Sequence, residues 1–359
     1  MVKLNLNLGE RGYPIYIATD INGLGKACSD ARLRGKMLIV TDTNVERYYS
    51  ADCARELENM GAEVSVYVIP AGEQNKTLET VSGIYRKLID LKADRNSTLV
   101  ALGGGVTGDI TGFAAATFMR GIHFIQIPTS LMAQADSSIG GKTGVDFEGS
   151  KNMVGAFYQP RFVYININTL RTLPERELRS GLAEVLKHGL ILDADFFAYI
   201  EYNIEKIFNF DENVLAYLTK MNCKIKGMVV EQDEREEGLR ELLNFGHTIG
   251  HAVESESGFT MLHGECVSVG MAGAYRLAFK LGMIDESLAE RVEKMLKKIG
   301  LPVKASGMDA QKIFNRMFYD KKVKDGRLSF VLPKQIGEVI RCTFDNEALL
   351  REVLDELVQ

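Results

Sequence analysis

A strand followed by a glycine-rich turn and a helix is the feature that most limits what this chain can fold into. Residues 97–102 are typical of a buried strand, Gly103-Gly104-Gly105-Val106-Thr107-Gly108-Asp109 follows directly, and a helix-like segment, Ile110–Phe118, comes next. Glycines let a backbone approach a diphosphate closely, and a helix N-terminus offers free N–H groups. We therefore predict an α/β domain with a nucleotide site. The alternative is a turn needed only for close packing of helix and strand.

The turn departs from a standard dinucleotide-binding unit. Gly103, Gly105 and Gly108 satisfy G-x-G-x-x-G, but no acidic residue ends the next strand, His123–Ile127, where a ribose would bind. The acidic residue at a strand end is instead Asp42, after residues 37–41. The sequence therefore predicts a nucleotide site on a variant of the Rossmann sheet.

The chain of 359 residues divides near residue 172. Before it, β-branched runs alternate with helical segments such as 78–91, which is typical of a mostly parallel sheet; the runs are 37–41, 63–69, 98–102, 123–127 and 162–167. After it, helical patterns dominate, at 174–190, 212–231, 240–256, 264–281, 285–299 and 345–358, with a strand-like pair near 328–332 and 339–342. We predict an α/β domain with a mostly parallel, Rossmann-like variant sheet over 1–172 and a mainly α-helical domain over 173–359.

Three of the five histidines lie between positions 247 and 263, which indicates a metal site because imidazole is a common ligand of zinc-like ions. His247 and His251 have the i, i+4 spacing of a zincin helix, yet Thr248 stands where that motif has its glutamate, so a metalloprotease is disfavoured. Alone, the pair fits helix-face or capping histidines equally well. The presence of His263 beside Glu265 favours the metal site over this alternative.

The best candidate for another ligand is Glu184. It is bordered by apolar residues and lies one helical turn before Lys187, so the two share a face. A buried carboxylate there needs a metal or a cation to offset its desolvation. The alternative is an ordinary solvated Glu/Lys pair.

We expect residues 135–146 to form a flexible, glycine-rich segment, which together with Lys151-Asn152 suits an anionic ligand. Gly141-Lys142-Thr143 imitates the end of a P-loop, but position 136 is Asp where that motif needs glycine. Further cations follow at Arg120, Lys226, Arg240 and the pair Lys321-Lys322.

The net charge of −5 argues against a nucleic-acid partner, and no apolar run reaches the roughly 18 residues of a membrane helix. The N-terminal residues 1–8 alternate like a strand, without an apolar leader core. Five scattered cysteines lack C-x-x-C spacing, so disulfides and thiolate metal ligation are not expected. We expect a cytoplasmic protein with no membrane partner.

Taken together, the motifs resemble the 3-dehydroquinate synthase family along nearly the whole chain. They are Pro70–Lys76, Gly103–Asp109, Pro128–Leu131, Asp136–Val145, Lys151-Asn152, Ala183–Gly189, Asp233–Ala252, His263–Glu265 and Asp320–Lys322. Because these segments occur in order, coincidence is a poor explanation.

The resemblance implies a role for each candidate residue. Metal ligands, for zinc or cobalt, would be Glu184, His247 and His263. NAD would contact Asp42, Ala71, Gly72, Glu73, Gln74, Asn75, Lys76, Gly104, Gly105, Val106, Thr107, Gly108, Asp109, Thr129, Ser130, Lys142, Lys151, Thr169, Leu170, Arg171 and Thr172. Catalytic and substrate-binding residues would be Arg120, Asp136, Lys142, Asn152, Lys187, Lys226, Arg240, Asn244, His251 and one of Lys321 and Lys322.

The implied activity is a lyase reaction of the shikimate pathway, which leads to chorismate and the aromatic amino acids. It converts 3-deoxy-D-arabino-heptulosonate 7-phosphate to 3-dehydroquinate and phosphate. The family is also expected to form a homodimer, in which Arg120 reaches the phosphate pocket of the neighbouring subunit.

Three other functions share part of the pattern. A sugar phosphate cyclase acting on sedoheptulose 7-phosphate or glucose 6-phosphate would not need a carboxylate clamp, which the cations Arg240 and Lys226 and the amide of Asn244 favour here. A metal-dependent polyol dehydrogenase would consume NAD stoichiometrically. A non-enzymatic metabolite-binding protein would have no reason to keep Glu184, His247 and His263 together.

Overall fold

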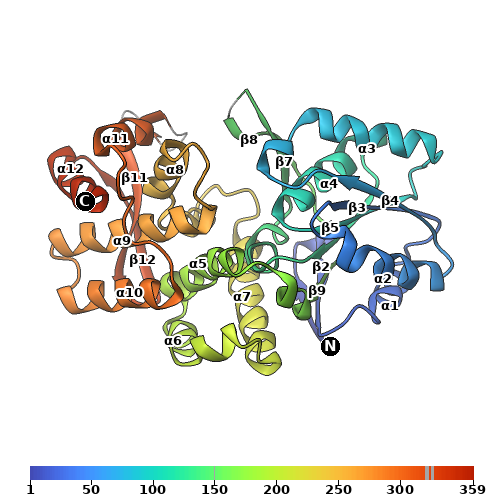
Figure 1. Ribbon diagram of the computed structural model, residues 1–359, viewed down its shortest axis with the longest axis horizontal. Helices are drawn as coiled ribbons and strands as arrows, with labels where there is room; N and C mark the ends of the chain where they lie inside the picture. Colours follow the sequence, from blue (N-terminus) through green and yellow to red (C-terminus); the bar gives the residue numbers. More distant parts are fainter. Residues whose placement is uncertain (149, 320–322, 325–326) are drawn as a thin grey trace. The chain divides into compact units, whose positions relative to one another are not determined.

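The computed structural model describes residues 1–148, 150–319, 323–324 and 327–359 (Figure 1). The chain forms two compact units. The first unit contains Met1–Leu173 and Phe210–Arg235, and the second contains Pro174–Asn209 and Glu236–Gln359. Among the described residues, no helix has the length and apolar character needed to cross a membrane.

The first unit is built on a seven-stranded sheet of order β1-β2-β9-β6-β5-β3-β4. All neighbouring strands are parallel except β1 and β2, which are antiparallel. The strands are β1 (Val2–Leu6), β2 (Tyr13–Ala18), β3 (Lys36–Asp42), β4 (Glu63–Ile69), β5 (Thr98–Gly103), β6 (His123–Pro128) and β9 (Val163–Asn166). A separate hairpin joins β7 (Lys142–Phe147) to β8 (Ser150–Phe157).

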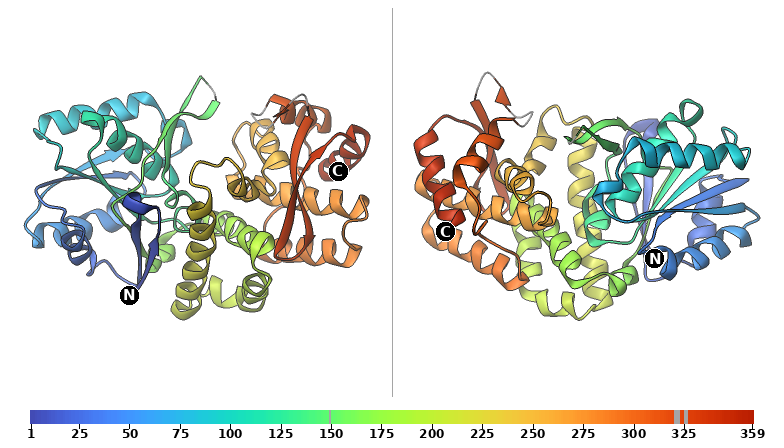
Figure 2. Two further views of the ribbon diagram at one scale, coloured as in Figure 1. Left: turned by 180° about the vertical axis from the view of Figure 1, so that it is seen from behind. Right: turned by 45° about the horizontal axis from the view of Figure 1, so that its top comes forward.

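Alternation along the central strands divides their side chains between two apolar clusters. Met37 and Ile39 of β3 belong to the cluster that includes residues of α1 (Leu24–Asp30) and α2 (Glu46–Asn59). Leu38 and Val40 belong to the opposite cluster, with α3 (Leu78–Asp90) and α4 (Gly105–Thr117). The sheet is therefore covered by helices on both faces, as the views in Figure 2 show.

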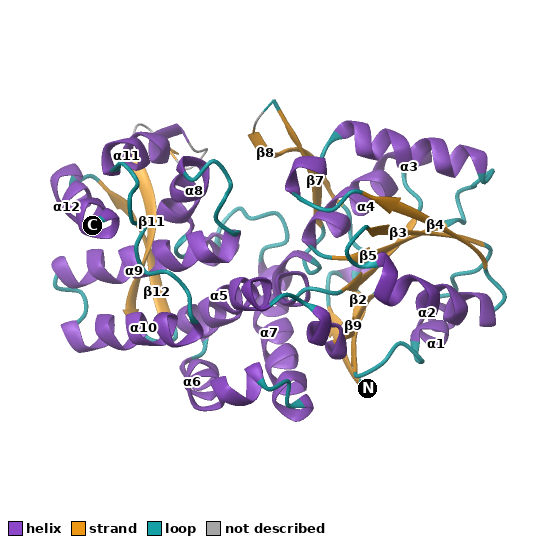
Figure 3. Cartoon of the chain, in the orientation of Figure 1, coloured by secondary structure: helices purple, strands orange, loops and turns teal. Residues whose placement is uncertain are grey.

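The second unit is mainly helical (Figure 3). Its helices are α5 (Glu175–Leu192), α6 (Ala194–Phe208), α8 (His247–Glu256), α9 (His263–Lys280), α10 (Glu286–Ile299), α11 (Ala310–Tyr319) and α12 (Glu347–Val358). A small antiparallel sheet joins β10 (Val323–Lys324), β11 (Arg327–Gln335) and β12 (Glu338–Phe344).

The predicted fold class is confirmed, with three differences in detail. The helix predicted at 240–256 begins only at His247, because Gly246 adopts a left-handed φ of 77° and the preceding Leu239–Asn244 forms a 3-10 turn. The glycine-rich segment expected to be flexible contains β7, and five elements were not predicted from the sequence: β2, β8, α1, α6 and α11. Helix α7 (Glu212–Gln232), predicted as part of the second domain, packs with the first unit. The division at residue 172 stays a prediction.

Candidate active site

In the first unit, most of the residues predicted to bind NAD lie at one edge of the seven-stranded sheet, whereas Lys142 and Lys151 lie on the β7–β8 hairpin. Asp42 ends β3, Thr129-Ser130 follows β6, and Thr169–Thr172 follows β9. The segment 71–76 follows β4, and Gly104–Asp109 follows β5. The carboxyl ends of parallel strands meet at the same edge, which is where open α/β sheets bind their ligands.

The glycine turn between β5 and α4 is tightly built. A side chain at Gly103 would come within 2.7 Å of Thr107, whose hydroxyl donates to Asp42 Oδ2 at 3.1 Å. At Gly105, an added Cβ would lie 3.0 Å from the Ser137 hydroxyl. The turn therefore leaves little room for a side chain at Gly103 or Gly105, and helix α4 begins there, as a diphosphate cradle requires.

A network of polar side chains extends from this turn to the β7–β8 hairpin. The buried Lys76 ammonium lies 2.6 Å from Asp109 Oδ2 and donates to Asn152 Oδ1. Burial raises the pKa of Asp109, although Lys76 acts in the opposite direction. The backbone N–H of Asn152 donates to Asp146 Oδ1 at 2.8 Å. A residue predicted to contact NAD thus touches one predicted to contact substrate.

Two further predicted substrate residues meet in the first unit. Lys226, on α7, forms an ion pair of 2.7 Å with Asp136, and Asp136 lies in a single π-helical turn, Ala133–Ser137. Such turns are frequent at functional sites. Lys142 is exposed on β7. Tyr49, which the sequence analysis did not select, donates to the Thr169 carbonyl at 3.2 Å and contacts the Thr172 hydroxyl.

In the second unit, two glycines of α9 let three helices approach closely. A Cβ at Gly264 would lie 1.9 Å from the Ser180 carbonyl oxygen on α5, and a Cβ at Gly270 would lie 1.8 Å from the carbonyl oxygen of Gly246, just before α8. Both neighbours are backbone atoms, which cannot rotate away. The close approach brings side chains of α5, α8 and α9 to one place.

Those side chains are the three predicted metal ligands. Glu184 Oε1 lies 3.7 Å from Nε2 of His247 and 3.5 Å from Nε2 of His263. One ligand atom from each residue lies within 4.8 Å of the others. Glu184 is fully buried, and its Oε1 accepts no hydrogen bond from any described residue. A buried carboxylate oxygen facing two imidazole nitrogens suits a divalent cation such as zinc.

Burial and neighbouring charges shift the pKa values of these three groups in different directions. Burial alone would raise the pKa of Glu184, but Lys187 and the two histidines hold that pKa well below its ordinary value. Burial and then Lys187 lower the pKa of His247 well below its ordinary value, so this imidazole is neutral and able to bind a metal. Burial acts to lower the pKa of His263, but Glu184 and Glu254 raise it to about 9.

The Lys187 ammonium contacts the other oxygen of Glu184, and the two side chains are 2% and 0% exposed. The alternative of a solvated surface pair is therefore wrong. His247 is buried and faces Glu184, so it is not a solvent-exposed residue of the helix face.

The remaining predicted residues of the second unit lie on or before α8. The ring of His251 has its centre 5.1 Å from that of His247 and 6.0 Å from that of His263. Arg240 is 3% exposed, and the Asn244 amide donates to Glu236 Oε1 at 3.0 Å. Lys321 and Lys322 lie outside the described residues. Arg120, in the first unit, is exposed.

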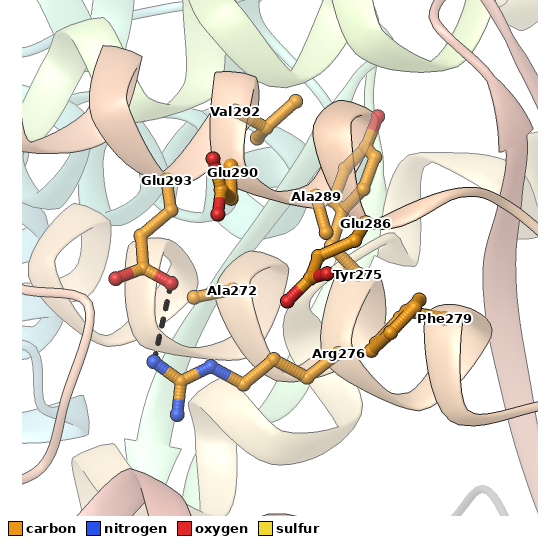
Figure 4. Close-up of a pocket in the computed structure, with 9 residues that line it drawn as sticks. All are labelled: Ala272, Tyr275, Arg276, Phe279, Glu286, Ala289, Glu290, Val292 and Glu293. Carbon is orange, nitrogen blue, oxygen red and sulfur yellow. Dashed lines mark hydrogen bonds and ion pairs between the residues drawn. The ribbon is translucent and has the colours of Figure 1, made fainter.

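A pocket lies between α9 and α10 (Figure 4). It is lined by Ala272, Tyr275, Arg276, Phe279, Glu286, Ala289, Glu290, Val292 and Glu293. Arg276 already pairs with Glu293 at 3.2 Å. No residue of the predicted site lines it, so the pocket adds nothing to the chemistry of the histidine cluster.

The fold is shared with solved sugar phosphate cyclases. A 2-deoxy-scyllo-inosose synthase complexed with carbaglucose-6-phosphate, NAD+ and Co2+ matches with 25% identity and a TM-score of 0.87, covering 99% of this chain and 100% of that one. The 2-epi-5-epi-valiolone synthase of Streptomyces hygroscopicus, with NAD+ and Zn2+ bound, matches with 29% identity and a TM-score of 0.89 over 96% of each chain. An iron-containing alcohol dehydrogenase shares the fold alone, at 16% identity and a TM-score of 0.69 over 96% of this chain and 97% of that one.

Sequence comparison assigns the chain to one family among the sugar phosphate cyclases. Residues 66–180 match the N-terminal model of 3-dehydroquinate synthase, and residues 181–323 match its C-terminal model. The 3-dehydroquinate synthases of Acetivibrio thermocellus and Ruminiclostridium cellulolyticum are 61% and 57% identical over 358 and 357 residues, with 99% of each chain covered. The chain belongs to the 3-dehydroquinate synthase family.

Proposed function

We propose that this protein converts 3-deoxy-D-arabino-heptulosonate 7-phosphate to 3-dehydroquinate and inorganic phosphate, with NAD and a divalent metal, zinc or cobalt, as cofactors. The observation that carries the proposal is the buried Glu184 carboxylate facing the Nε2 atoms of His247 and His263. It occurs in a chain that matches the family over almost its whole length. The two cyclases of known structure have NAD+ with Co2+ or Zn2+ bound, which supports the same pair here.

The residues present fit both cofactors. Glu184, His247 and His263 would hold the ion, because a catalytic zinc site has three protein ligands and keeps a position open for substrate. The side-chain-free turn at Gly103–Gly105 and the start of α4 would hold the NAD diphosphate. When bound, the nicotinamide takes up and later returns a hydride, and the ion polarises the substrate hydroxyl oxygen.

The substrate needs such help because the proton that must be lost before phosphate elimination is not acidic. Oxidation of the adjacent hydroxyl to a ketone makes this proton acidic, and phosphate then leaves. Reduction of the ketone, opening of the hemiketal ring and an intramolecular aldol reaction complete the product. Substrate, product and phosphate balance without net oxidation.

The chain's own residues have proposed roles in this sequence. His251 lies beside the two histidine ligands and would move a proton at the substrate hydroxyl. Lys187 holds Glu184 ionised through their ion pair. We assign Lys142, Arg240 and Asn244 to the substrate carboxylate, and Asn152, Arg120 and the Lys321/Lys322 pair to the phosphate.

The proposed cycle predicts phosphate release without NADH accumulation. Incubation of the purified protein with the heptulosonate phosphate, NAD and zinc should release phosphate over many turnovers, with no lasting rise in NADH absorbance. Omitting NAD, or removing metal with a chelator, should abolish release. NADH formed in equal amount to the substrate consumed would instead indicate a polyol dehydrogenase, and activity only on phosphates without a carboxylate would indicate another cyclase.

We further propose that the protein acts as a homodimer in the cytoplasm, with Arg120 serving the partner's site. Three successive residues after α4 have left-handed φ values: Met119 at 50°, Arg120 at 69° and Gly121 at 121°. Strain of this kind in residues other than glycine is often kept where function needs it. Arg120 is also exposed and available to a partner. The five cysteines are free, which supports a reducing compartment.

Subunit mixing tests this geometry. Arg120→Ala and Lys142→Ala should each be inactive, and a mixed dimer should recover activity, because one site would be intact and the other would carry both lesions. If Arg120 acted within its own subunit, each site of the mixed dimer would keep one lesion. No recovery after demonstrated subunit exchange would therefore refute the proposal.

A further inference from the structure

We propose that Glu254 is a positioning residue for the metal site: its carboxylate holds Nδ1 of His263 and so directs Nε2 of that imidazole toward the ion shared with Glu184 and His247. The proposal rests on the metal dependence proposed above. It gives a role to a residue that the sequence analysis did not select.

Helix α8 places Glu254 beside the metal ligands. Glu254 follows His251 by three residues and His247 by seven, so all three lie on one face of the helix. Its side chain is 6% exposed, and Oε2 lies 3.6 Å from Nδ1 of His263. A carboxylate buried to this extent requires a cation or a donor to offset its desolvation, and the His263 imidazole lies at ion-pair distance.

The two nitrogens of His263 face different carboxylates. Nε2 lies 3.5 Å from Glu184 Oε1, and Nδ1 lies 3.6 Å from Glu254 Oε2. A proton kept on Nδ1 leaves the lone pair of Nε2 for the metal. Carboxylates in this position fix the orientation of a ligating imidazole and increase its basicity.

His247 has the equivalent arrangement with a different acceptor. Its Nδ1 lies 3.0 Å from the Phe245 carbonyl oxygen, and its Nε2 faces Glu184 Oε1. Both imidazoles therefore present the same nitrogen to the same oxygen. The difference is in packing, because the side chain of His247 is 11% exposed and that of His263 is 33% exposed. His263, at the first position of α9, is the ligand that needs a separate restraint.

A competing arrangement would make Glu254 itself a ligand. His251, Glu254 and His263 also offer atoms within 4.8 Å of one another. Glu184 is the better ligand, because its Oε1 is completely buried and accepts no hydrogen bond from the described residues. If Glu184 is the ligand, Glu184→Gln should lose zinc; if Glu254 is the ligand, Glu184→Gln should keep zinc and Glu254→Gln should lose it.

Zinc affinity, measured by competition with a chelator, tests the role of Glu254. Glu254→Gln keeps an acceptor of the same shape and should weaken zinc binding about tenfold, whereas Glu254→Ala should weaken it about a hundredfold. The matched control is Glu256→Gln on the same helix, whose carboxylate pairs with Arg316 at 2.8 Å and Lys312 at 3.7 Å. This control should bind zinc as the wild type does. The d–d absorption of bound Co2+ should change in the Glu254 variants alone.

Thermal unfolding of the metal-free proteins establishes which variants are folded. If Glu254→Ala does not fold, the zinc affinity of Glu254→Gln alone tests the proposed role of Glu254. Wild-type zinc affinity and an unchanged cobalt spectrum in folded Glu254→Gln would overturn the proposal while leaving the proposed function intact. Loss of zinc in Glu254→Gln together with retention in Glu184→Gln would also overturn it, because Glu254 would then be a ligand. Failure of the wild type to bind zinc would refute the proposed function itself.

Discussion

Glu184→Gln, His247→Ala and His263→Ala will purify without stoichiometric zinc and will release phosphate about a thousandfold more slowly than the wild type. Two remaining ligands hold a catalytic ion poorly, and polarisation by the ion is worth several kcal/mol of transition-state stabilisation. His251→Ala will keep its zinc and still lose about a hundredfold or more in rate, because a proton-transferring group has this effect without binding the ion. Metal analysis and phosphate release on the same four preparations give both readouts.

His251→Ala is the informative member of this series. Its ring lies close to both histidine ligands, so sequence spacing and ring distances alone do not distinguish a ligand from a neighbour. Nε2 of His247 and Nε2 of His263 each lie within ion-pair distance of Glu184 Oε1, which favours these two histidines as the ligands. A zinc-free His251→Ala protein would show that this assignment is wrong.

Gly270→Ala will lower the free energy of unfolding by about 3 kcal/mol or more and will weaken zinc binding as well. The added methyl group would lie 1.8 Å from the Gly246 carbonyl oxygen, 2.8 Å from its carbonyl carbon and 2.9 Å from the Gly250 nitrogen. Overpacking against side chains costs about 1–3 kcal/mol, and backbone atoms yield less easily. Separation of α9 from α8 would move His263 away from His247. Denaturant unfolding of the metal-free protein and chelator competition measure the two effects.

Gly273→Ala is the matched control on the same helix. Its methyl group would meet only the ends of the Ile249 and Leu357 side chains, at 2.7 and 2.9 Å, and these can rotate. Alanine also favours a helix by about 1 kcal/mol over glycine. We expect a change in stability within about 1 kcal/mol and normal zinc affinity. Equal effects of the two substitutions would contradict the proposed role of close backbone packing.

Five of the parallel strands, β3, β4, β5, β6 and β9, were predictable because each is a short apolar run between turn residues, and a run of this length is too short for a typical helix. The hairpin of β7 and β8 was not predictable from the sequence. Its glycines suggested flexibility, whereas Gly144 and Gly155 are directly paired and a Cβ at either would lie within 2.7 Å of a carbonyl oxygen on the opposite strand. A single sequence does not distinguish a glycine kept for close approach from one kept for freedom of movement.

The metal ligands could be selected from residue type and from the resemblance, but their geometry could not. Glu184 and Lys187 share a helix face by periodicity alone. The direction of each histidine nitrogen, in contrast, depends on where α9 packs against α5 and α8. Glu254 could have been found from its spacing of seven residues after His247, which places a carboxylate on the histidine face. The sequence did not indicate that Glu254 contacts His263, because this contact depends on how α9 packs against α8.

The membership of α7 in the first unit has a consequence for how the protein is made. Helix α7 packs on β1, β2 and the segments 133–137 and 167–172, and its Asn222 amide donates to the Ala135 carbonyl at 2.6 Å. During synthesis the ribosome completes the seven-stranded sheet well before this helix emerges, with α5 and α6 made in between. The surface of the nascent sheet that α7 covers therefore stays exposed until residue 235 has left the ribosomal exit tunnel. Vectorial folding of the first unit cannot finish before part of the second has been translated.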